Sequence, residues 1–328
     1  MPDLDERLLL RGTAQEVFAS DPSIKDIAQL GWLGLLTAEN AGGEGWFPYE
    51  AALIALEGGR AGTASTWFMT ALAAGILSRA PEAQKEIGAL LSGDQVGAFA
   101  SAPLLTMTAG TVAGTASRVL SERAPDVVVL AGPPALSLIA TTTQQLGVAL
   151  HPNVETLETM RRLFRLTLDT ARVHSIDRQA VAPVELLATV LLSADTVGAV
   201  GRAVQIVTDY LVEREAFGVP IASFQVVQHR LVDLTLFHSA SEALVLSAAG
   251  ALALGEPRAE RLALAAHTYI ESRAVHAVDD CIQLAGGIGF TWEFPVHHLL
   301  RRASTNAALL TSARTSRHQL AALRGWGQ

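Results

Sequence analysis

The segment that decides the fold is REAFGVPIASFQ, residues 214–225, at the end of a long helical pattern. Arg214, Phe217 and Gln225 leave that helix together and enter a Gly/Pro turn. Arginine supplies a planar fork for phosphate oxygens, phenylalanine a face for a flat ring, and glutamine both a donor and an acceptor. The alternative is an ordinary helix end, with Arg214 favoured by the helix dipole, Phe217 in the core and Gly218 as the stop. Physical chemistry alone favours this alternative.

A second motif, QLAGGIGF, occupies residues 283–290 after another helical pattern. Gly286 and Gly287 permit positive φ angles and close approach of the backbone to a ligand. Gln283 precedes them by one helical turn. A glycine cluster of this kind is also typical of a simple helix stop. The motif lacks the strand and spacing of a dinucleotide-binding fingerprint, and it lacks the Gly-Lys-Ser/Thr of a P-loop.

Working outward from these motifs, apolar periodicity predicts helices on both sides. The long helices are expected over residues 184–214, 233–254, 259–284 and 301–323. Pro183 suits the first turn of the first of these helices, because that turn needs no backbone N–H. Four long antiparallel helices with short connections predict a C-terminal four-helix bundle over residues 181–328.

The preceding region, residues 96–180, has a different residue composition and no helical periodicity. Short runs rich in Val, Thr and Leu, such as 127–130 and 163–173, are separated by turn residues. They predict a reduced β-barrel or sandwich of short antiparallel strands. Residues 1–95 predict an N-terminal helical domain, in which Gly58-Gly59 should end the helix that contains Tyr49. The expected fold is mainly α with a small β-barrel between the two helical domains.

The composition excludes several classes of protein. The chain has 328 residues, a net charge of −8 and one cysteine. This acidic balance argues against nucleic-acid binding, which needs a basic patch, and the single cysteine excludes an internal disulfide. No apolar run is expected to span a bilayer, which needs about 20 residues, and the acidic N-terminus does not resemble a signal peptide. We expect a cytoplasmic protein without a metal site.

Taken together and in this order, the motifs resemble those of the acyl-CoA dehydrogenase family over nearly the whole chain. The stretch LGWLGL at 30–35, followed by Gly42-Gly43-Glu44-Gly45, resembles the family's N-terminal helical domain. Residues 293–296 and 301–303 resemble the segment that follows its late flavin-contacting turn. The resemblance implies the fold of that family and the α,β-dehydrogenation of an acyl-CoA thioester with FAD.

In that family each FAD is shared between two subunits. The middle and C-terminal domains of one subunit hold the flavin ring. The neighbouring subunit supplies an arginine, a phenylalanine, a glutamine and a Gln-x-x-Gly-Gly backbone to the ADP end. By position, the resemblance implies that this chain supplies the following cofactor-binding groups: Arg214, Phe217, Gln225, Gln283, Gly286 and Gly287.

The general base of the reaction departs from the family pattern. Removal of a proton from Cα requires a carboxylate beside it. Counting from Arg301 without gaps places Leu310 where most members carry that glutamate, and counting back from Arg214 places Ala188 where others carry it. Glu185 is one helical turn from Ala188 and could reach the same face, although a solvated glutamate near a helix start is the competing interpretation. We therefore predict no catalytic residue in this chain.

The middle domain departs as well. Family members have a Thr/Ser-Glu-Pro turn and then a Gly-Ser-Asp loop, whereas here Ala100-Ser101-Ala102-Pro103 stands in place of the turn and no such loop follows. The residues with which this chain would hold a flavin ring in its own site are therefore incomplete. The residues that it would contribute to the flavin site of a neighbouring subunit are present. This combination resembles the non-catalytic subunit of heteromeric acyl-CoA dehydrogenases of actinobacterial steroid side-chain degradation. It implies a heterotetramer with a second, catalytic dehydrogenase-like subunit and a steroid-like or other bulky acyl-CoA.

Two alternatives remain open from the sequence. The chain could be a self-sufficient homo-oligomeric acyl-CoA dehydrogenase that uses Glu185 as its base. It could also be a flavin-free scaffold with the same fold. Dehydrogenase activity of the isolated chain would support the first alternative. A complex whose flavin content and activity do not change when Arg214 is replaced by alanine would support the second.

Overall fold

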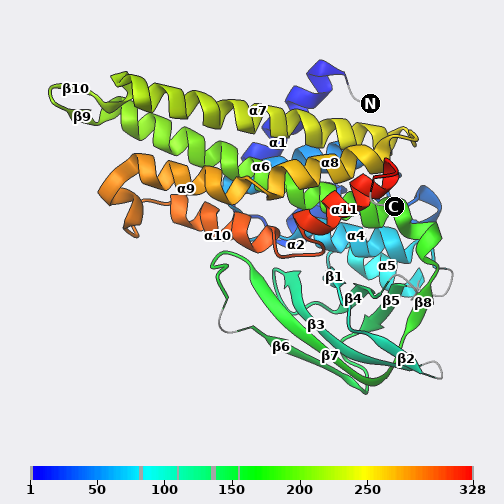
Figure 1. Cartoon of the computed structure of the whole chain (residues 1–328). Helices are drawn as coiled ribbons and strands as arrows, with labels where there is room; N and C mark the ends of the chain where they lie inside the picture. Colours follow the sequence, from blue (N-terminus) through cyan, green and yellow to red (C-terminus); the bar gives the residue numbers. More distant parts are fainter. Residues whose placement is uncertain (1–2, 81–83, 109–110, 134–137, 154–155, 327–328) are drawn as a thin grey trace.

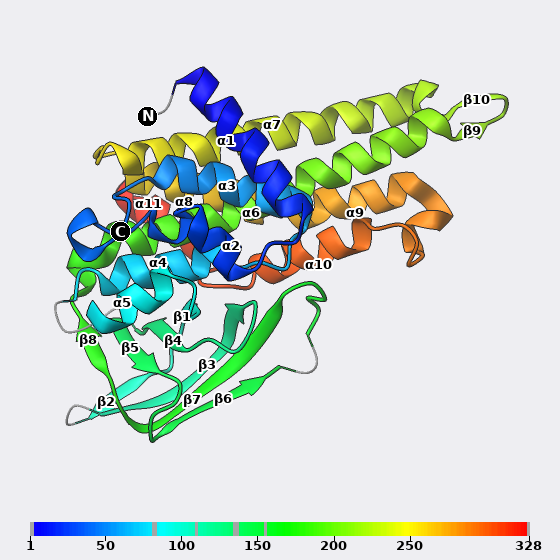
Figure 2. The ribbon, with the colours of Figure 1, turned by 180° about the vertical axis from the view of Figure 1, so that it is seen from behind.

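The computed structural model describes residues 3–80, 84–108, 111–133, 138–153 and 156–326. Long C-terminal helices form one layer, two small sheets form another, and the N-terminal helices pack between and behind them (Figure 1). From behind, α3 lies along the long helix α6, while α4 and α5 lie between the bundle and the sheets (Figure 2). This is the mainly helical architecture with a small β domain that the sequence predicts.

Five α-helices form the N-terminal part: α1 (Leu4–Ala19), α2 (Ile24–Gln29), α3 (Pro48–Ala61), α4 (Trp67–Leu77) and α5 (Gln84–Leu91). Helices α1 and α2 each begin with a capping box. The side chain of Asp3 accepts from the Glu6 backbone N–H, and that of Ser23 accepts from the Asp26 backbone N–H. Each capping side chain satisfies a backbone donor that the first turn leaves unpaired.

Helix α3 continues through Gly58-Gly59, so the prediction of a helix stop there is wrong. It ends at Gly62, which has a φ of 67° and closes the helix in the left-handed conformation. The glycines serve helix packing instead: a Cβ on Gly59 would lie 1.9 Å from the Asp195 carbonyl oxygen, and one on Gly198 would lie 1.9 Å from the Leu56 carbonyl oxygen. The backbones of α3 and α6 therefore meet without side chains between them.

The middle region consists of two small sheets and is not a closed barrel. Of the reduced barrel or sandwich that the sequence predicts, the two-sheet arrangement is the one observed. One sheet has the order β1-β4-β5-β8 and the other the order β2-β3-β7-β6. The pairing of β1 with β4 is parallel, and the other pairings in both sheets are antiparallel. The strands are β1 (Gly97–Ser101), β2 (Thr106–Thr108), β3 (Thr111–Ser121), β4 (Val127–Ala131), β5 (Leu138–Thr142), β6 (Val148–Pro152), β7 (Arg162–Arg172) and β8 (His174–Ile176).

The C-terminal helices form the expected bundle with different bounds. They are α6 (Arg178–Glu213), α7 (Gln225–Ala253), α8 (Ala259–Glu271), α9 (Ala274–Ala285), α10 (Val296–Asn306) and α11 (Ala313–Leu323). The third predicted helix is thus two helices, broken at residues 272–273, and the fourth is two helices broken at 307–312. In the bundle α6 packs against α7, α8, α9 and α10, while α11 lies against α8.

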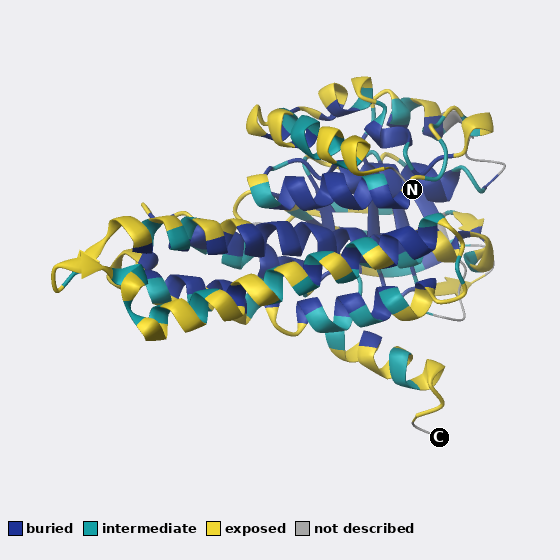
Figure 3. Ribbon diagram, turned by 90° about the horizontal axis from the view of Figure 1, so that it is seen from above, coloured by how far each residue is buried: buried dark blue, intermediate teal, exposed yellow. Residues whose placement is uncertain are grey.

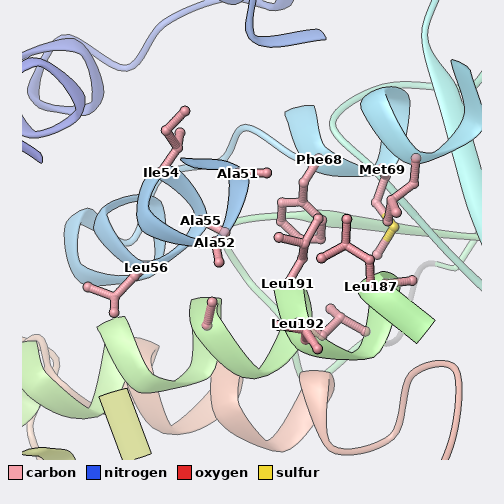
Figure 4. Close-up of a cluster of buried hydrophobic side chains, with 14 of the residues drawn as sticks. Ala51, Ala52, Ile54, Ala55, Leu56, Phe68, Met69, Leu187, Leu191 and Leu192 are labelled. Atoms are coloured by element: carbon pink, nitrogen blue, oxygen red, sulfur yellow. The ribbon is translucent and has the colours of Figure 1, made fainter. Parts of the chain in front are cut away.

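Helix α6 is the central element of the molecule. It begins at Arg178, because the Asp177 side chain caps it by accepting from the Gln179 backbone N–H at 3.0 Å. Pro183 therefore lies beyond the first turn, which corrects the predicted position. Leucines of α6 pack with Phe68 and Met69 of α4 and with the small residues of α3 in the main core (Figure 4).

Two helices, α6 and α7, are long and apolar enough by length and composition to cross a membrane. This differs from the expectation that no run would reach that length. In the most apolar stretch of α6, 67% of the residues are buried inside the chain, which is typical of a core helix. In α7 the share is 39%, and the apolar side chains of Val226, Val232 and Leu236 are among the exposed ones on that helix.

Candidate functional site

The decisive segment folds as a short hairpin beyond the end of α6. Its strands are β9 (Glu215–Ala216) and β10 (Val219–Pro220), with Ala216 paired to Val219. Phe217 and Gly218 form the two-residue turn with φ angles of 56° and 81°, as a hairpin of this length requires. Phe217 is 97% exposed, so its assignment to the core in the helix-end interpretation is wrong. Its ring meets that of Phe224 edge to face at 6.3 Å.

The base of the hairpin is fixed by backbone hydrogen bonds. The Arg214 N–H donates to the Tyr210 carbonyl at 2.9 Å, and the Ile221 N–H donates to the Arg214 carbonyl at 2.8 Å. The side chain of Arg214 is exposed, and so is that of Gln225, the first residue of α7. Neither side chain has a hydrogen-bond or ion-pair partner within the described ranges. Both are therefore free to bind a group outside the chain.

The glycine motif forms the end of α9 and the short helix η4 (Gly286–Phe290). Gly286 ends α9 with a φ of 68°, which a glycine adopts without strain. A Cβ on Gly289 would lie 2.4 Å from the Ile282 carbonyl oxygen, so packing within the chain requires that glycine. A Cβ on Gly287 would meet no described atom within 4 Å, and its φ is not positive. The conformation and packing of this chain alone do not explain the glycine at 287.

Both motifs lie at the same end of the bundle. The β9–β10 hairpin and the end of α9 project together at the left in Figure 1 and at the right in Figure 2. An ion pair between Arg230 of α7 and Asp280 of α9 joins the helices, and the rings of Tyr210 and Phe294 meet at 5.6 Å. Gln283 is exposed at this end. Figure 3 shows that this end is largely exposed. We call it the cofactor edge, after the cofactor-binding role that the family resemblance implies for the following residues: Arg214, Phe217, Gln225, Gln283, Gly286 and Gly287.

The two candidate positions for the base carry no carboxylate. Leu310 packs against the main core with a φ of 47°, and Ala188 is fully buried. Glu185 is held by Arg178, whose Nε donates to Oε2 at 3.0 Å and whose Nη2 donates to Oε1. The same guanidinium also donates to the carbonyl of Gly132 at 3.2 Å. Glu185 is therefore half of an ion pair directed toward the loop after β4.

A cleft of about 720 Å³ separates the second sheet from α10. Arg118 of β3 crosses it, and its Nη1 donates to the carbonyl oxygen of Ala308 at 2.7 Å. Arg301 joins the same two parts of the chain, since its Nη1 donates to the Leu157 carbonyl at 3.3 Å. The cleft between the middle and C-terminal regions is therefore bridged by the chain itself.

A buried charge network fixes α10 against α6, and sequence reasoning missed it. Asp195 of α6 accepts from Arg302 of α10, from the Asn306 amide at 2.7 Å and from Arg161 at 3.2 Å. Arg161 also donates to Glu158 at 2.7 Å. Burial alone would raise the pKa of the Asp195 carboxyl, but the two arginines hold it below its usual value. The available signal was a single aspartate inside the apolar stretch of residues 186–201.

The described residues hold no group of three or more His, Cys, Asp or Glu side chains suited to a metal ion.

Comparison with known proteins identifies the family. The profile described as acyl-CoA dehydrogenase, N-terminal domain, matches residues 9–94, and that described as acyl-CoA dehydrogenase, C-terminal domain, matches residues 187–310. Acyl-CoA dehydrogenase IpdE2 of Mycobacterium tuberculosis is 31% identical over 291 residues, which are 87% of this chain and 81% of that protein.

Solved structures share the fold. The Tcur3481-Tcur3483 steroid ACAD superposes with a TM-score of 0.87 at 22% identity, with 98% of each chain covered. The ChsE4-ChsE5 complex from Mycobacterium tuberculosis superposes with a TM-score of 0.85 at 20% identity, with 100% of this chain and 99% of that chain covered. From the two profiles and the relative at 31% identity, we conclude that the chain belongs to the acyl-CoA dehydrogenase family.

Proposed function

We propose that this chain is the cofactor-lending subunit of a heteromeric, FAD-dependent acyl-CoA dehydrogenase of the cytoplasm. The observation that carries the proposal is Phe217, an aromatic residue that is 97% exposed at a positive φ. A non-glycine residue in this conformation costs on the order of 1–3 kcal/mol, and an exposed phenyl ring forgoes its burial energy. Contact with a flavin cofactor held by a partner chain would offset both costs.

The groups at the cofactor edge fit the ADP end of FAD. Arg214 offers an unpaired guanidinium for phosphate oxygens, and Gln225 and Gln283 offer amide donors and acceptors. The open space beside Gly287 lets a ligand approach the backbone. When bound, FAD supplies the acceptor for the hydride that leaves the acyl-CoA. This chain's own contribution is to bind and orient the cofactor.

The residues that would form a catalytic site within this chain favour a separate catalytic partner over a self-sufficient enzyme. The aliphatic side chain of Leu310 cannot accept a proton, and Glu185 is held by Arg178. Arg118 spans the cleft in which the family's middle and C-terminal domains hold the flavin ring. We therefore assign the base and the ring-binding half to a second acyl-CoA dehydrogenase-like subunit.

The relatives support the finer parts of the proposal. One similar structure is named a steroid dehydrogenase, and another is a complex of two differently named chains. We propose that this chain also pairs with an unlike chain, that the two form a heterotetramer, and that the partner chain acts on a steroid-like or other bulky acyl-CoA in lipid metabolism.

Coexpression tests this function. The chain is purified alone and together with the dehydrogenase-like reading frame that neighbours it in the genome, and flavin absorbance is compared with protein content. We expect almost no flavin in the isolated chain and one FAD for each pair of unlike chains in the complex. Stoichiometric FAD in the isolated chain, together with acyl-CoA dehydrogenation, would instead establish the self-sufficient enzyme. A flavin content of the complex that is unchanged in Arg214→Ala would establish the flavin-free scaffold.

A further inference from the structure

A cavity of about 890 Å³ lies among the N-terminal helices, away from the cofactor edge. It is bounded by α1, by the connection between α2 and α3, by the start of α3 and by the end of α7. Gln225 at the cofactor edge is the first residue of α7, and Ala253 in the cavity wall is the last. The 29 residues of this helix span about 43 Å, so the cavity is separate from the cofactor edge.

Aromatic side chains form much of the cavity wall. They belong to Trp32, Trp46, Phe47 and Tyr49. The indole N–H of Trp46 donates to the Leu252 carbonyl at 3.1 Å, which fixes this ring against the end of α7. The faces of aromatic rings carry partial negative charge and attract cations. The wall therefore offers surfaces that suit a positively charged group with an apolar coat.

Two of these rings hold cations of the chain itself. The guanidinium carbon of Arg7 lies 4.9 Å from the centroid of the Tyr49 ring, and that of Arg79 lies 5.3 Å from the centroid of the Trp46 ring. Neither arginine is among the described residues that line the cavity. The contacts show that rings of this wall attract positive charge in their folded environment.

The ionisable groups that line the cavity are carboxylates. They are Glu6 of α1, Glu44 of the connection before α3 and Glu50 of α3, and no Lys, Arg or His is among the described lining residues. Glu6 accepts from the Asp3 backbone N–H at 2.9 Å, whereas Glu44 and Glu50 have no hydrogen bond or ion pair within the described ranges. A Cβ on Gly31 would lie 3.0 Å from Oε1 of Glu44, so this carboxylate lies against a residue of the wall.

The helix ends around the cavity do not neutralise this charge. Helix α7 ends in the wall at Ala253 and Leu254, and a helix C-terminus carries about half a negative charge. Helices α1 and α3 begin beside the cavity, and each N-terminus carries about half a positive charge. Arg7 adds one positive charge next to Tyr49. Three carboxylates outweigh these groups together, so the cavity keeps a negative charge.

We infer that this cavity binds an organic cation, an ammonium group attached to an apolar body. Its carboxylates supply the counter-charge, and aromatic faces bind alkylated ammonium groups. The exposed side chains of Leu30, Phe47 and Leu254 offer apolar surface for the attached body. The volume of about 890 Å³ lies in the range of about 300–1,000 Å³ for small-molecule sites. The inference goes beyond the proposed function and does not depend on it.

Titration of the isolated full-length chain with phenyltrimethylammonium chloride tests the inference. The heat of binding is measured at constant ionic strength. Benzenesulfonate is the comparison ligand, because it combines the same ring with a negative charge. We expect saturable binding of the cation at one site and no saturable binding of the anion.

Variants of the lining residues connect that binding to the cavity. Glu44→Gln and Glu50→Gln remove a charge with little change of shape, and each should weaken binding by about twofold to fivefold, the scale of an exposed ion pair. The double variant should weaken it by about tenfold, since separate effects add. Phe47→Leu keeps an apolar side chain but removes the ring, and it should also weaken binding by about twofold to fivefold.

Glu39→Gln is the matched control, because Glu39 is an exposed glutamate of the short helix η2 (Glu39–Ala41) in the same connection and does not line the cavity. It should leave the affinity nearly unchanged, since salt screens a distant surface charge. The side chains replaced in the single variants are at least partly exposed, so their melting temperatures should match that of the wild type.

Three results would overturn the inference: no saturable binding of the cation, equal affinity for benzenesulfonate, or wild-type affinity in the double variant. Equal affinity for the anion would show an apolar groove without charge selection. None of these results bears on the proposed function, which is tested by flavin content in the complex and by variants of the cofactor edge.

Discussion

The carboxylate of Asp195 receives two hydrogen bonds from the guanidinium of Arg302, from Nε to Oδ2 at 2.9 Å and from Nη2 to Oδ1 at 2.5 Å. Both side chains are almost fully buried. The pair joins α6 to α10, and Arg302 also donates to the Thr63 carbonyl at 2.8 Å in the connection between α3 and α4. One ion pair therefore fixes the N-terminal helices and the wall of the cleft to the central helix.

Removal of one member of this pair should be strongly destabilising. Arg302→Met leaves the Asp195 carboxylate buried with a reduced set of partners, and breaking a buried pair costs about 3–5 kcal/mol. The free energy of unfolding is measured by urea denaturation of the isolated chain. Arg301→Met is the control, because Arg301 is partly exposed and loses an exposed hydrogen bond to the Leu157 carbonyl at 3.3 Å and a cation–π contact with Trp292. The cation–π contact contributes about 1 kcal/mol or less. Equal losses in the two variants would contradict the structural role of the pair.

Glu271 should make the stability depend on pH. Its Oε2 is buried without a hydrogen-bond partner in the described structure, and burial raises the pKa of this carboxyl to about 8. In the unfolded chain the carboxyl of this residue releases its proton near the ordinary glutamate pKa of 4.5. The folded state is thus favoured most below that value, and the advantage is lost as the pH rises from there toward 8.

The Glu271→Gln variant measures this effect, because the amide cannot ionise. Its free energy of unfolding at pH 8 should exceed that of the wild type by roughly a few kcal/mol, and the difference should shrink toward pH 5. Glu260→Gln, on the exposed face of the same helix, should leave the wild-type pH profile unchanged. A wild-type stability that is flat between pH 5 and pH 8 would rule out this account of Glu271.

Gly287 and Gly289 of η4 should respond differently to substitution. Gly289→Ala should destabilise the isolated chain, because the new Cβ would lie 2.4 Å from the Ile282 carbonyl oxygen. Gly287→Ala should leave the melting temperature of the isolated chain nearly unchanged but lower the flavin content of the complex. Thermal unfolding and flavin absorbance measure the two effects. If Gly287→Ala keeps full flavin content, then Gly287 does not lie against the cofactor.

Glu185 should be dispensable for the reaction. Glu185→Gln keeps the shape of the side chain and a weaker contact with Arg178, so the dehydrogenation rate of the complex should stay within about twofold of the wild type. Loss of a general base lowers rates by about 10²–10⁴-fold. The rate is followed with an artificial electron acceptor. A loss on that scale, in a variant whose flavin content is normal, would make Glu185 the base.

Sequence reasoning predicted the elements that rest on local patterns and composition. The family and the mainly helical fold with a small β domain follow from motifs and periodicity along the chain. Features set by contacts between distant segments were not predictable in the same way. Two adjacent glycines are typical of a helix stop, so Gly58-Gly59 was predicted to end the helix. Their actual role is the close crossing of α3 and α6 at Gly198, which is a tertiary contact that the local sequence does not indicate. The pairing of Asp195 with Arg302 spans 107 residues and has no local signature.

The sheets were the least predictable part. Short apolar runs indicate strands but leave their partners undefined, so the parallel β1–β4 pairing differs from the antiparallel strands that the sequence predicts. A β-bulge in β3, at Ser117 and Arg118, likewise depends on the register with β7. The environment of Phe217 was not predictable for another reason: the same residues suit a helix end and a hairpin. The 97% exposure of Phe217 excludes the core position, and its contact with a ligand stays a prediction.

The most direct test of the account is the affinity of the purified two-chain complex for FAD after substitutions at the hairpin of this chain. Arg214→Ala should weaken FAD binding by about 1–3 kcal/mol, the scale of a charged hydrogen bond. Phe217→Ala, made as a separate variant, should also weaken FAD binding without unfolding the chain. Arg202→Ala, an exposed arginine on α6 outside the cofactor edge, serves as the control. Unchanged FAD affinity in both hairpin variants, with the complex still assembled, would contradict the claim that this chain lends its cofactor edge to a partner.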